Sequence, residues 1–545
     1  MTHDQLSRVP VPENEPVRSY APGSPERESL KATLEAMSAA EPLEIRGCIG
    51  GEPAVTGNVG ECRQPHAHAK LLARFQKCGA HEVKRAVAAA SAAHTAWGGL
   101  AWEQRAAVFL KAAELLAGPF RDRMNAATML GQSKTVFQAE IDAACELIDF
   151  WRFNVHFMHQ AYEEQPGSAP GEWNQLDHRP LEGFVFAVTP FNFTSIAGNL
   201  PTAPAMMGNT VIWKPATTSI LSSYVIMEVL EAAGLPPGVI NFLPGDGADV
   251  GDPALASPGL AGIHFTGSTG TFHNMWRRIG ANIADYRSYP RIVGETGGKD
   301  FVFAHPSAEL EPLVTALVRG AFEYQGQKCS AASRAFIPAS LWERVLEALT
   351  AQTAQIRVGS PMDFRNFMCA VIDAKAYVSV MGYIEHARRS SDHAVILGGK
   401  GDDREGWFIE PTLVAADAPD TRLMREEIFG PVLTLYRYED KRIDAALAAL
   451  DRASPYALTG AVFCRDRAEI ARLTRMLRFA AGNFYINDKP TGAVVGRQPF
   501  GGGRASGTND KAGSVLNLLR WVSPRAIKET FAPPIDFRYR HMSEE

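Results

Sequence analysis

A cysteine at position 329 stands in a setting that suits a nucleophile. It follows the run Gly326-Gln327-Lys328 and precedes the small residues Ser330, Ala331 and Ala332. A reactive thiolate needs little side-chain bulk around it, backbone N–H groups that can face the reacting atom, and access for a substrate. Free cysteines are usually buried packing residues, so this pattern indicates catalysis only together with partners elsewhere in the chain.

Two polar residues upstream could be those partners. Glu295 is a carboxylate in the glycine turn Glu295-Thr296-Gly297-Gly298, and Asn192 lies in the aromatic turn Phe191-Asn192-Phe193. A carboxylate between a strand and a Gly-Gly turn can swing, which suits a base that is needed in only some steps of a reaction. These two residues raise the case for Cys329 as a nucleophile.

The elements that must position these residues alternate between strand and helix. Apolar runs predict two helices, at 199–207 and 219–233, and strands at 184–188, 210–213, 239–243, 262–265 and 292–294. Such alternation favours a doubly wound parallel sheet, which binds ligands beyond the carboxyl ends of its strands. The segments 189–195, 214–215 and 266–271 all lie at such ends.

One of these ends could hold a phosphate. Gly267-Ser268-Thr269-Gly270 opens a helix after a strand, so its N–H groups could meet a phosphate group. The run is not a complete Gly-x-Gly-x-x-Gly fingerprint, and an ordinary strand-to-helix turn is the alternative. Lys214, at the end of another strand, could donate to ribose hydroxyls or face solvent.

Composition excludes several classes of protein. The net charge of −5 over 545 residues offers no basic surface for nucleic acid, and no apolar run has the roughly 18–20 residues of a membrane span. Seven cysteines scattered from Cys48 to Cys464 do not form a disulfide framework. We expect a reduced, soluble, intracellular protein that binds neither nucleic acid nor membrane.

The remaining segments are predicted from local pattern. Residues 1–60 are expected to form a loosely ordered arm with a short helix near 29–39. The run Cys62-Arg63-Gln64-Pro65-His66-Ala67-His68 lacks a second ligand pair for zinc, so we expect a surface turn and no metal site.

In a helix at 141–157, periodicity places Glu146 and Asp149 on a solvated face, with a pocket-facing carboxylate as the alternative. The Pro/Gly-broken stretch 163–180 is typical of a hairpin or flap.

The chain also resembles the aldehyde dehydrogenase superfamily over nearly its whole length. The motifs that carry the resemblance are, in chain order, Pro190-Phe191-Asn192-Phe193, Trp213-Lys214-Pro215, Phe265-Thr266-Gly267-Ser268, Glu295-Thr296-Gly297-Gly298-Lys299, Gly326-Gln327-Lys328-Cys329, Glu427-Ile428-Phe429-Gly430-Pro431 and Pro499-Phe500-Gly501-Gly502. Stretches at 139–150, 322–324, 484–489 and 504–511 are similar to the long form of the branch that oxidises glutamate γ-semialdehyde. This aldehyde arises by ring opening of 1-pyrroline-5-carboxylate, and its oxidation to glutamate is the second step of proline breakdown.

The resemblance implies a covalent mechanism. Cys329 attacks the aldehyde carbon to give a thiohemiacetal, whose oxyanion accepts hydrogen bonds from Asn192 and the N–H of Cys329. After hydride transfer to a nicotinamide, Glu295 activates the water that hydrolyses the thioester.

The resemblance also implies NAD as cofactor. The cofactor-binding residues that it implies are Thr189 and Pro190 at the nicotinamide, Lys214 at the adenosine ribose, Gly267, Ser268, Thr269, Gly270 and Thr271 along the pyrophosphate, Glu427 at the nicotinamide ribose and Phe429 against the ring. Many relatives carry a glutamate three residues after the lysine, which repels a 2′-phosphate. This chain has Thr217 there, so the exclusion of NADP stays open.

The substrate residues are implied in the same way. The α-carboxylate would meet the Ser330 hydroxyl and the N–H groups of Gly492 and Ala493, a position where some relatives have serine. Phe193 and Phe500 would sandwich the aliphatic part, with Glu146 further out, and plain core packing is the alternative for these two rings. The anchor argues against a dehydrogenase for another ω-semialdehyde, and the intact catalytic set argues against an idle scaffold.

The expected architecture is an α/β fold. It comprises an N-terminal arm and helices (1–162) that join a Rossmann-type NAD domain (182–298), a small β oligomerisation flap (163–181), an α/β catalytic domain (299–505) and a return segment with an oligomerisation tail (506–545). A flap of this kind implies a homodimer or higher homo-oligomer. A separate proline dehydrogenase could be a partner. The expected compartment is the cytoplasm, or the mitochondrial matrix in a eukaryote.

Overall fold

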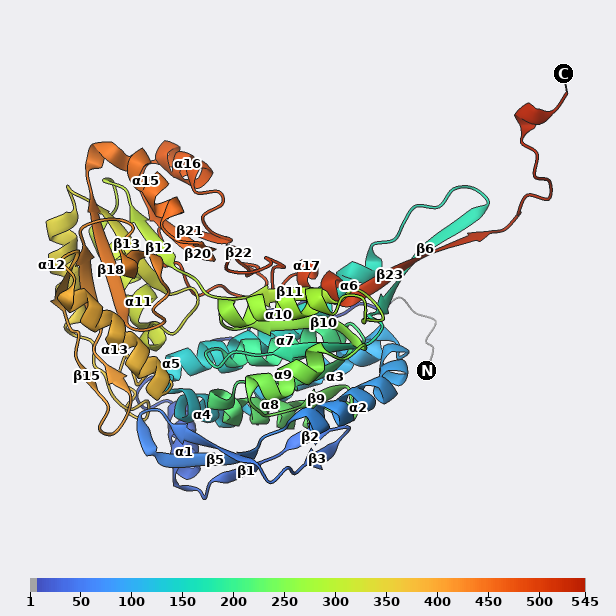
Figure 1. Cartoon of the computed structure of the whole chain (residues 1–545), viewed down its shortest axis with the longest axis horizontal. Coiled ribbons are helices and arrows are strands. Elements are labelled where there is room, and N and C mark those ends of the chain that lie inside the picture. The colour runs from blue at the N-terminus through green and yellow to red at the C-terminus, as the bar shows by residue number, and fades with distance from the viewer. Residues whose placement is uncertain (1–6, 545) are drawn as a thin grey trace.

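The computed structural model describes residues 7–544, so residues 1–6 of the predicted arm, and residue 545, lie outside the described residues. Two seven-stranded sheets form the centre of the molecule, each with helices packed on both faces (Figure 1). Strands near the N-terminus and in the middle of the chain build the first sheet. Strands from residue 300 onward build the second.

The first sheet has the strand order β11-β10-β7-β8-β9-β2-β3. Its strands are β2 (Gly47–Ile49), β3 (Glu52–Ala54), β7 (Phe184–Val188), β8 (Thr210–Lys214), β9 (Ile240–Phe242), β10 (Leu260–Thr266) and β11 (Arg291–Glu295). The five strands from β7 to β11 run parallel, as predicted, while β2 pairs antiparallel with β9.

Alternating residues of this sheet enter two separate cores. In β7, Val185 and Ala187 join the core on the side of α6, α7 and α8, and Phe184 and Phe186 join the core on the side of α2, α9 and α10. Burial on both faces explains why these strands read as continuous apolar runs. The helices are α2 (Ala80–Gly98), α3 (Trp102–Ala117), α4 (Arg121–Gln132), α6 (Leu147–Glu163), α7 (Thr194–Met206), α8 (Ile220–Ala233), α9 (Gly247–Leu255) and α10 (Thr269–Ala281).

The second sheet has the order β14-β17-β18-β13-β12-β20-β21 and is parallel apart from its edge strand β14. Its strands are β12 (Asp300–Ala304), β13 (Ala332–Pro338), β14 (His393–Leu397), β17 (Thr412–Ala416), β18 (Val432–Tyr438), β20 (Thr459–Phe463) and β21 (Asn483–Ile486). The helices around it are α11 (Leu310–Phe322), α12 (Trp342–Thr353), α13 (Ala374–Arg389), α14 (Arg422–Arg425), α15 (Ile443–Arg452) and α16 (Arg467–Met476).

The described part of the predicted N-terminal arm is more ordered than expected. Helix α1 (Pro25–Ala39) buries Leu30 and Leu34, and a three-stranded sheet follows with the order β1-β5-β4. Its strands are β1 (Leu43–Ile45), β4 (Val59–Gln64) and β5 (Ala67–Gln76). The helix predicted near 29–39 is confirmed, but the prediction of a loose arm for residues 7–60 is wrong, because Leu30, Leu34 and Ile45 pack in the core.

The run at 62–68 contains the expected turn, at residues 65–66, but this turn is buried and not on the surface. Cys62 lies in β4 with its side chain in the core, and His66 is buried with Nδ1 2.7 Å from the Ser133 hydroxyl. Within residues 7–544, no group of three or more His, Cys, Asp or Glu side chains could hold a metal ion.

The predicted helix at 141–157 consists of two different helices. A π-helix, η1 (Glu140–Glu146), runs directly into α6. Asp149 is 3% exposed, so its assignment to a solvated face is wrong, and Glu146 is half-buried. The extra residue in a π-turn rotates the following side chains, and a 3.6-residue period applied across it assigns them to the wrong face.

The stretch after α6 leaves the body of the molecule. Strand β6 (Glu172–Pro180) pairs antiparallel with β23 (Val522–Thr530) over its whole length, and the two project outward with the C-terminal segment (Figure 1). The domain boundaries given above stay a prediction. No helix among the described residues is both long and apolar enough to span a bilayer.

Candidate active site

The segment before Cys329 is a tight, strained turn. The short turn η3 (Glu323–Gly326) follows α11, and Tyr324, Gln325 and Gly326 all have left-handed φ angles, of 52°, 56° and 66°. Only glycine adopts this region freely, so the surroundings must stabilise the turn. The Gln325 side chain does so, because its amide donates to Ala370 O at 2.7 Å and accepts from Cys369 N at 2.9 Å.

Asn192 lies directly against this turn. Its Nδ2 donates to the backbone oxygen of Gln327 at 3.1 Å, and its side chain is 4% exposed. A side-chain amide and the chain that carries the thiol are therefore brought together, although 135 residues separate Asn192 from Gln327.

Asp142 of η1 fixes the start of α7, two residues beyond Asn192. Its carboxylate accepts from the N–H groups of Thr194 and Ser195, both at 3.1 Å, and from the Ser195 hydroxyl at 2.8 Å. Acceptors at a helix N-terminus satisfy N–H groups that have no partner within the helix. Asp142 also pairs with the fully buried Lys134. Nothing in the sequence pattern singles out this pair.

Glu295 is the last residue of β11 and rests on a second glycine turn. Its Oε2 accepts from Gly502 N at 2.8 Å, and a Cβ on Gly507 would lie 2.8 Å from the same oxygen. Burial raises the pKa of Glu295 well above its usual range, with Gly502 N and Lys511 acting in the opposite direction. The carboxyl group therefore takes up a proton readily.

The thiol of Cys329 is not activated at rest. It is 9% exposed, and burial raises its pKa well above that of a free cysteine, with further increases from Asp300, Glu427 and Glu295. A neutral thiol is a poor nucleophile. Formation of the thiolate thus requires a base or a positive charge brought in with a ligand.

Glu427 lies next to the turn that follows Glu295. Its Oε1 accepts from Gly298 N at 2.9 Å, and burial raises its pKa to about 7. Phe429, with a left-handed φ of 57°, packs edge-on against Phe191 at 5.9 Å between ring centroids. Both residues thus come from the second sheet and meet the loops of the first.

The predicted cofactor residues lie where the parallel strands of the first sheet end. Lys214 closes β8, burial lowers its pKa to about 8, and within residues 7–544 its ammonium makes no hydrogen bond or ion pair. A half-buried cation without a partner among the described residues fits a ligand rich in hydroxyl oxygens. Trp213 Nε1 donates to the Thr189 hydroxyl at 3.0 Å, and Pro190 is buried beside it.

The start of α10 fits a phosphate. Ser268 caps the helix by accepting from Thr271 N at 3.2 Å, and the N–H groups of Thr269 and Gly270 have no acceptor inside the helix. A Cβ added at Gly270 would meet nothing within 4 Å, so a ligand can approach the backbone closely. The turn and helix of the sequence prediction are confirmed here, and the ligand stays a prediction.

The predicted substrate residues come together in part. The Ser330 hydroxyl lies 2.7 Å from that of Thr491, which places Ser330 beside the turn of Gly492 and Ala493. The Lys134 ammonium lies 4.5 Å from the centre of the Phe193 ring. Phe500 pairs with Ala512 in an isolated β-bridge. The sandwich of substrate between these two rings stays a prediction.

Glu146 lies near the Lys134–Asp142 pair. Burial and the Asp142 carboxylate raise its pKa to about 8, and Lys134 acts in the opposite direction. Residues that sequence reasoning missed, Lys134 and Asp142 above all, thus form a polar network next to the predicted pocket.

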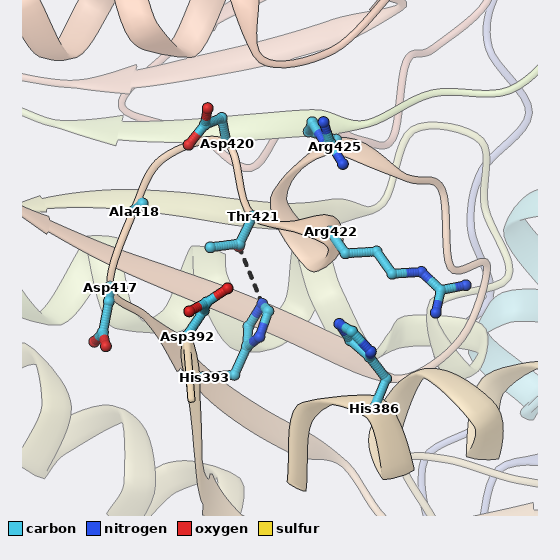
Figure 2. A pocket seen from close by; sticks show the side chains of 9 residues that line it. All are labelled: His386, Asp392, His393, Asp417, Ala418, Asp420, Thr421, Arg422 and Arg425. Atoms are coloured by element: carbon cyan, nitrogen blue, oxygen red, sulfur yellow. Dashed lines mark hydrogen bonds between the residues drawn. The ribbon is translucent and has the colours of Figure 1, made fainter. Parts of the chain in front are cut away.

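A separate cavity of about 420 Å³ lies at the edge of the second sheet, where β14 begins and β17 ends (Figure 2). His386 and His393 face one another there, and His393 Nε2 is 3.0 Å from the Thr421 hydroxyl. Three aspartates and two arginines complete the lining, so the cavity favours neither sign of charge. It contains none of the predicted site residues.

Comparison with known proteins agrees with this geometry. Residues 55–524 match the aldehyde dehydrogenase family. The mitochondrial delta-1-pyrroline-5-carboxylate dehydrogenase of Dictyostelium discoideum is 50% identical over 545 residues, which cover 99% of this chain and 98% of that protein. The crystal structure of the delta-pyrroline-5-carboxylate dehydrogenase of Mycobacterium tuberculosis bound with NAD is 56% identical with a TM-score of 0.96, and covers 99% of this chain and 100% of that one.

A further solved structure, proline utilization A from Bdellovibrio bacteriovorus, is 30% identical with a TM-score of 0.91. The match covers 97% of this chain and 54% of that one. The amide of Asn192 on the turn before Cys329 and the carboxylate of Glu295 on its glycine turn fit these matches, which show that the chain belongs to the aldehyde dehydrogenase family.

Proposed function

We propose that the protein oxidises L-glutamate γ-semialdehyde to L-glutamate with NAD. The observation that carries the proposal is the arrangement around Cys329. Asn192 is hydrogen-bonded to the residue two before the cysteine, and Ser330, directly after it, reaches the turn of Gly492 and Ala493. One side of the nucleophile thus offers donors for an aldehyde oxygen, and the other offers donors for a carboxylate.

The reaction begins at the thiol. Cys329 Sγ bonds to the aldehyde carbon, and the proton that it loses goes to a buried carboxylate, a role that we assign to Glu295, whose charge acts on the thiol together with those of Asp300 and Glu427. The oxygen of the resulting thiohemiacetal becomes an anion, and Asn192 Nδ2 and the N–H of Cys329 donate to it. To do so, Asn192 must exchange its hydrogen bond with Gln327 O for one with the substrate oxygen.

NAD, when bound, accepts the hydride that leaves the aldehyde carbon. Lys214, Thr269, Gly270 and Glu427 would hold it, since they offer an unpaired ammonium, free helix N–H groups and a carboxylate acceptor for ribose hydroxyls. Glu295 must first release to solvent the proton that it took from Cys329. It then takes a proton from the water that attacks the thioester, and Cys329 leaves as the thiolate.

Substrate preference tests the proposal. We expect kcat/KM for pyrroline-5-carboxylate to exceed that for propanal by about 100-fold or more, because hydrogen bonds to a charged group contribute about 1.5–3 kcal/mol each. Ser330→Ala should lower kcat/KM for pyrroline-5-carboxylate about tenfold and leave propanal unchanged. Absorbance of the reduced cofactor measures both. Equal turnover of the two aldehydes by the unmodified protein would favour a general aldehyde dehydrogenase instead.

We further propose that the protein is at least a dimer. The flap and the C-terminal segment expose large apolar side chains, which a monomer would leave in water: Trp173, Phe531, Ile535 and Phe537. A second copy of this chain is the proposed cover.

Two further proposals concern the partner and the compartment. The related part of proline utilization A supports a separate proline dehydrogenase as a functional partner. Relatives named mitochondrial support the matrix as the compartment in a eukaryote, and the cytoplasm is proposed otherwise.

The state of assembly gives the next prediction. Trp173→Asp combined with Phe531→Asp should shift the protein toward monomer in analytical ultracentrifugation, since charges would be buried at the interface. Val378→Asp, which changes an exposed residue of α13, serves as the matched control and should leave the assembly unchanged. Identical sedimentation of all three proteins would rule out the flap as the interface.

A further inference from the structure

The turn that offers Gly492 and Ala493 belongs to a long irregular segment, residues 487–502, between β21 and β22 (Gly503–Arg504). Backbone pairing holds its two ends, where Asn487 N donates to Val462 O and Phe500 pairs with Ala512, so side chains must position the part between them. At its start, Lys489 Nζ donates to Thr491 O at 2.9 Å, and Thr491 meets Ser330. At Val495 and Arg497 the partner is a residue near the N-terminus.

That residue is Asn14. Its Nδ2 donates to the backbone oxygen of Val495 at 2.9 Å and to Asp149 Oδ2 at 2.8 Å, while its Oδ1 accepts from Arg497 Nε at 3.0 Å. The Asn14 side chain therefore donates through its nitrogen and accepts through its oxygen at the same time. It connects α6 to the segment that carries Gly492 and Ala493, across sequence separations of 135 and 481 residues.

We propose that Asn14 is a positioning residue for the substrate carboxylate: it fixes the turn of Gly492 and Ala493 relative to α6, so the N-terminal segment determines how tightly an aldehyde with an α-carboxylate binds. The inference rests on the proposed function, since it assigns those backbone N–H groups to the carboxylate. Asn14 touches no reacting atom and acts only through Val495, Arg497 and Asp149.

The N-terminal segment is firm enough for this role. Glu15 N donates to Asp149 Oδ1 at 2.7 Å, and the Glu15 carboxylate pairs with Arg121 and with Arg152. Further along, Arg18 N and the Tyr20 hydroxyl donate to Glu140 of η1 at 2.9 and 2.8 Å. Hydrogen bonds to charged groups are stronger than neutral ones, and Arg121 and Glu140 are fully buried.

The other side of the turn is equally fixed. Val495 is 5% exposed, and Gly496, with φ at 80°, lies so close to α6 that a Cβ would overlap the ring of Phe153. The segment thus packs on α6 from one direction and is tied through Asn14 from another. Without the hydrogen bonds of Asn14, the backbone N–H groups of residues 492 and 493 should move away from the positions in which they can donate to the substrate carboxylate.

The test compares two aldehydes in the full-length protein. Asn14→Ala should raise the KM for pyrroline-5-carboxylate about tenfold, keep kcat within about twofold, and leave kcat/KM for propanal unchanged, because propanal has no carboxylate to place. Arg18→Ala is the matched control on the same segment. It removes a peripheral side-chain contact with Ala117 O, keeps Asn14 in place, and should leave both substrates unchanged.

A second variant covers the case in which Asn14→Ala does not fold. Arg497 is an exposed residue whose Nε donates one of the three hydrogen bonds of the Asn14 side chain. Arg497→Ala removes that bond and keeps Asn14, so the KM for pyrroline-5-carboxylate should rise about threefold. In the double variant the two effects should not add, since both remove the same contact.

An unchanged KM for pyrroline-5-carboxylate in Asn14→Ala, or in Arg497→Ala if only that variant folds, would overturn the inference. So would an equal loss of kcat on both aldehydes, which indicates general damage. Failure of the proposed function looks different, because the unmodified protein would then show no preference for pyrroline-5-carboxylate over propanal, and the inference would fall with it.

Discussion

Cys329→Ala should lower kcat for pyrroline-5-carboxylate by about 10⁴-fold or more, because removal of a nucleophile leaves only binding and oxyanion stabilisation to act on the substrate. Cys329 is the thiol that the turn of three left-handed residues presents beside Asn192. The change from thiol to methyl is small, so the fold and cofactor binding should persist. Steady-state reduction of NAD measures the loss, and cofactor fluorescence titration checks that binding is retained.

Cys48→Ala provides the matched control for this variant. Cys48 is half-buried in β2, next to the edge strand β3 of the first sheet, and its thiol lies 3.7 Å from the Glu231 carboxylate. We expect full activity. If Cys329→Ala retained more than about one hundredth of the rate while Cys48→Ala lost it, the assignment of the nucleophile would be refuted.

The second large effect is expected for Glu295→Gln. Without the carboxylate the thioester should accumulate, and kcat should fall by about 10²–10⁴-fold, the usual contribution of a general base. A pre-steady-state burst of reduced NAD should come before the slow phase, and intact-protein mass spectrometry should detect the acylated Cys329. Glutamine keeps the size of the side chain and can still accept the hydrogen bond from Gly502 N.

Glu295 should also determine how kcat changes with pH. Burial raises the pKa of Glu295, and a base must be deprotonated to act, so kcat should increase as pH rises through that pKa. Glu295→Gln should lose this ascending limb. A profile that kept it in the variant would assign the titration to another group, for which Glu427, with a pKa raised to about 7, is the first candidate.

Local patterns predicted the first sheet well. Its parallel strands read as apolar runs because they are buried on both faces, and the run Gly267-Ser268-Thr269-Gly270 after a strand predicted the helix that begins at Thr269. The motif residues Asn192, Glu295 and Cys329 were found for a related reason, since each lies where a regular element ends at a turn with a distinctive composition.

The remaining parts of the site could not be predicted, because they depend on contacts between distant segments. Asp142 lies in a π-helix, where side chains do not follow the 3.6-residue period of an α-helix, so that period cannot tell which of them face the interior. Asn14 is an ordinary polar residue in a proline-rich stretch, and only the fold brings it to Val495. Lys134 gives no signal either, since a lysine is expected on the surface unless its partner is known.

The pairing of β6 with β23 also constrains the order in which the molecule can be made. Arg179 and its partner Ser523 lie 344 residues apart. A ribosome that adds roughly 5–20 residues per second leaves β6 without its partner for tens of seconds while the second sheet is still being synthesised. During that time β6 is an open strand edge on each nascent chain, so crowded polysomes are the setting in which wrong strand pairing between chains would begin.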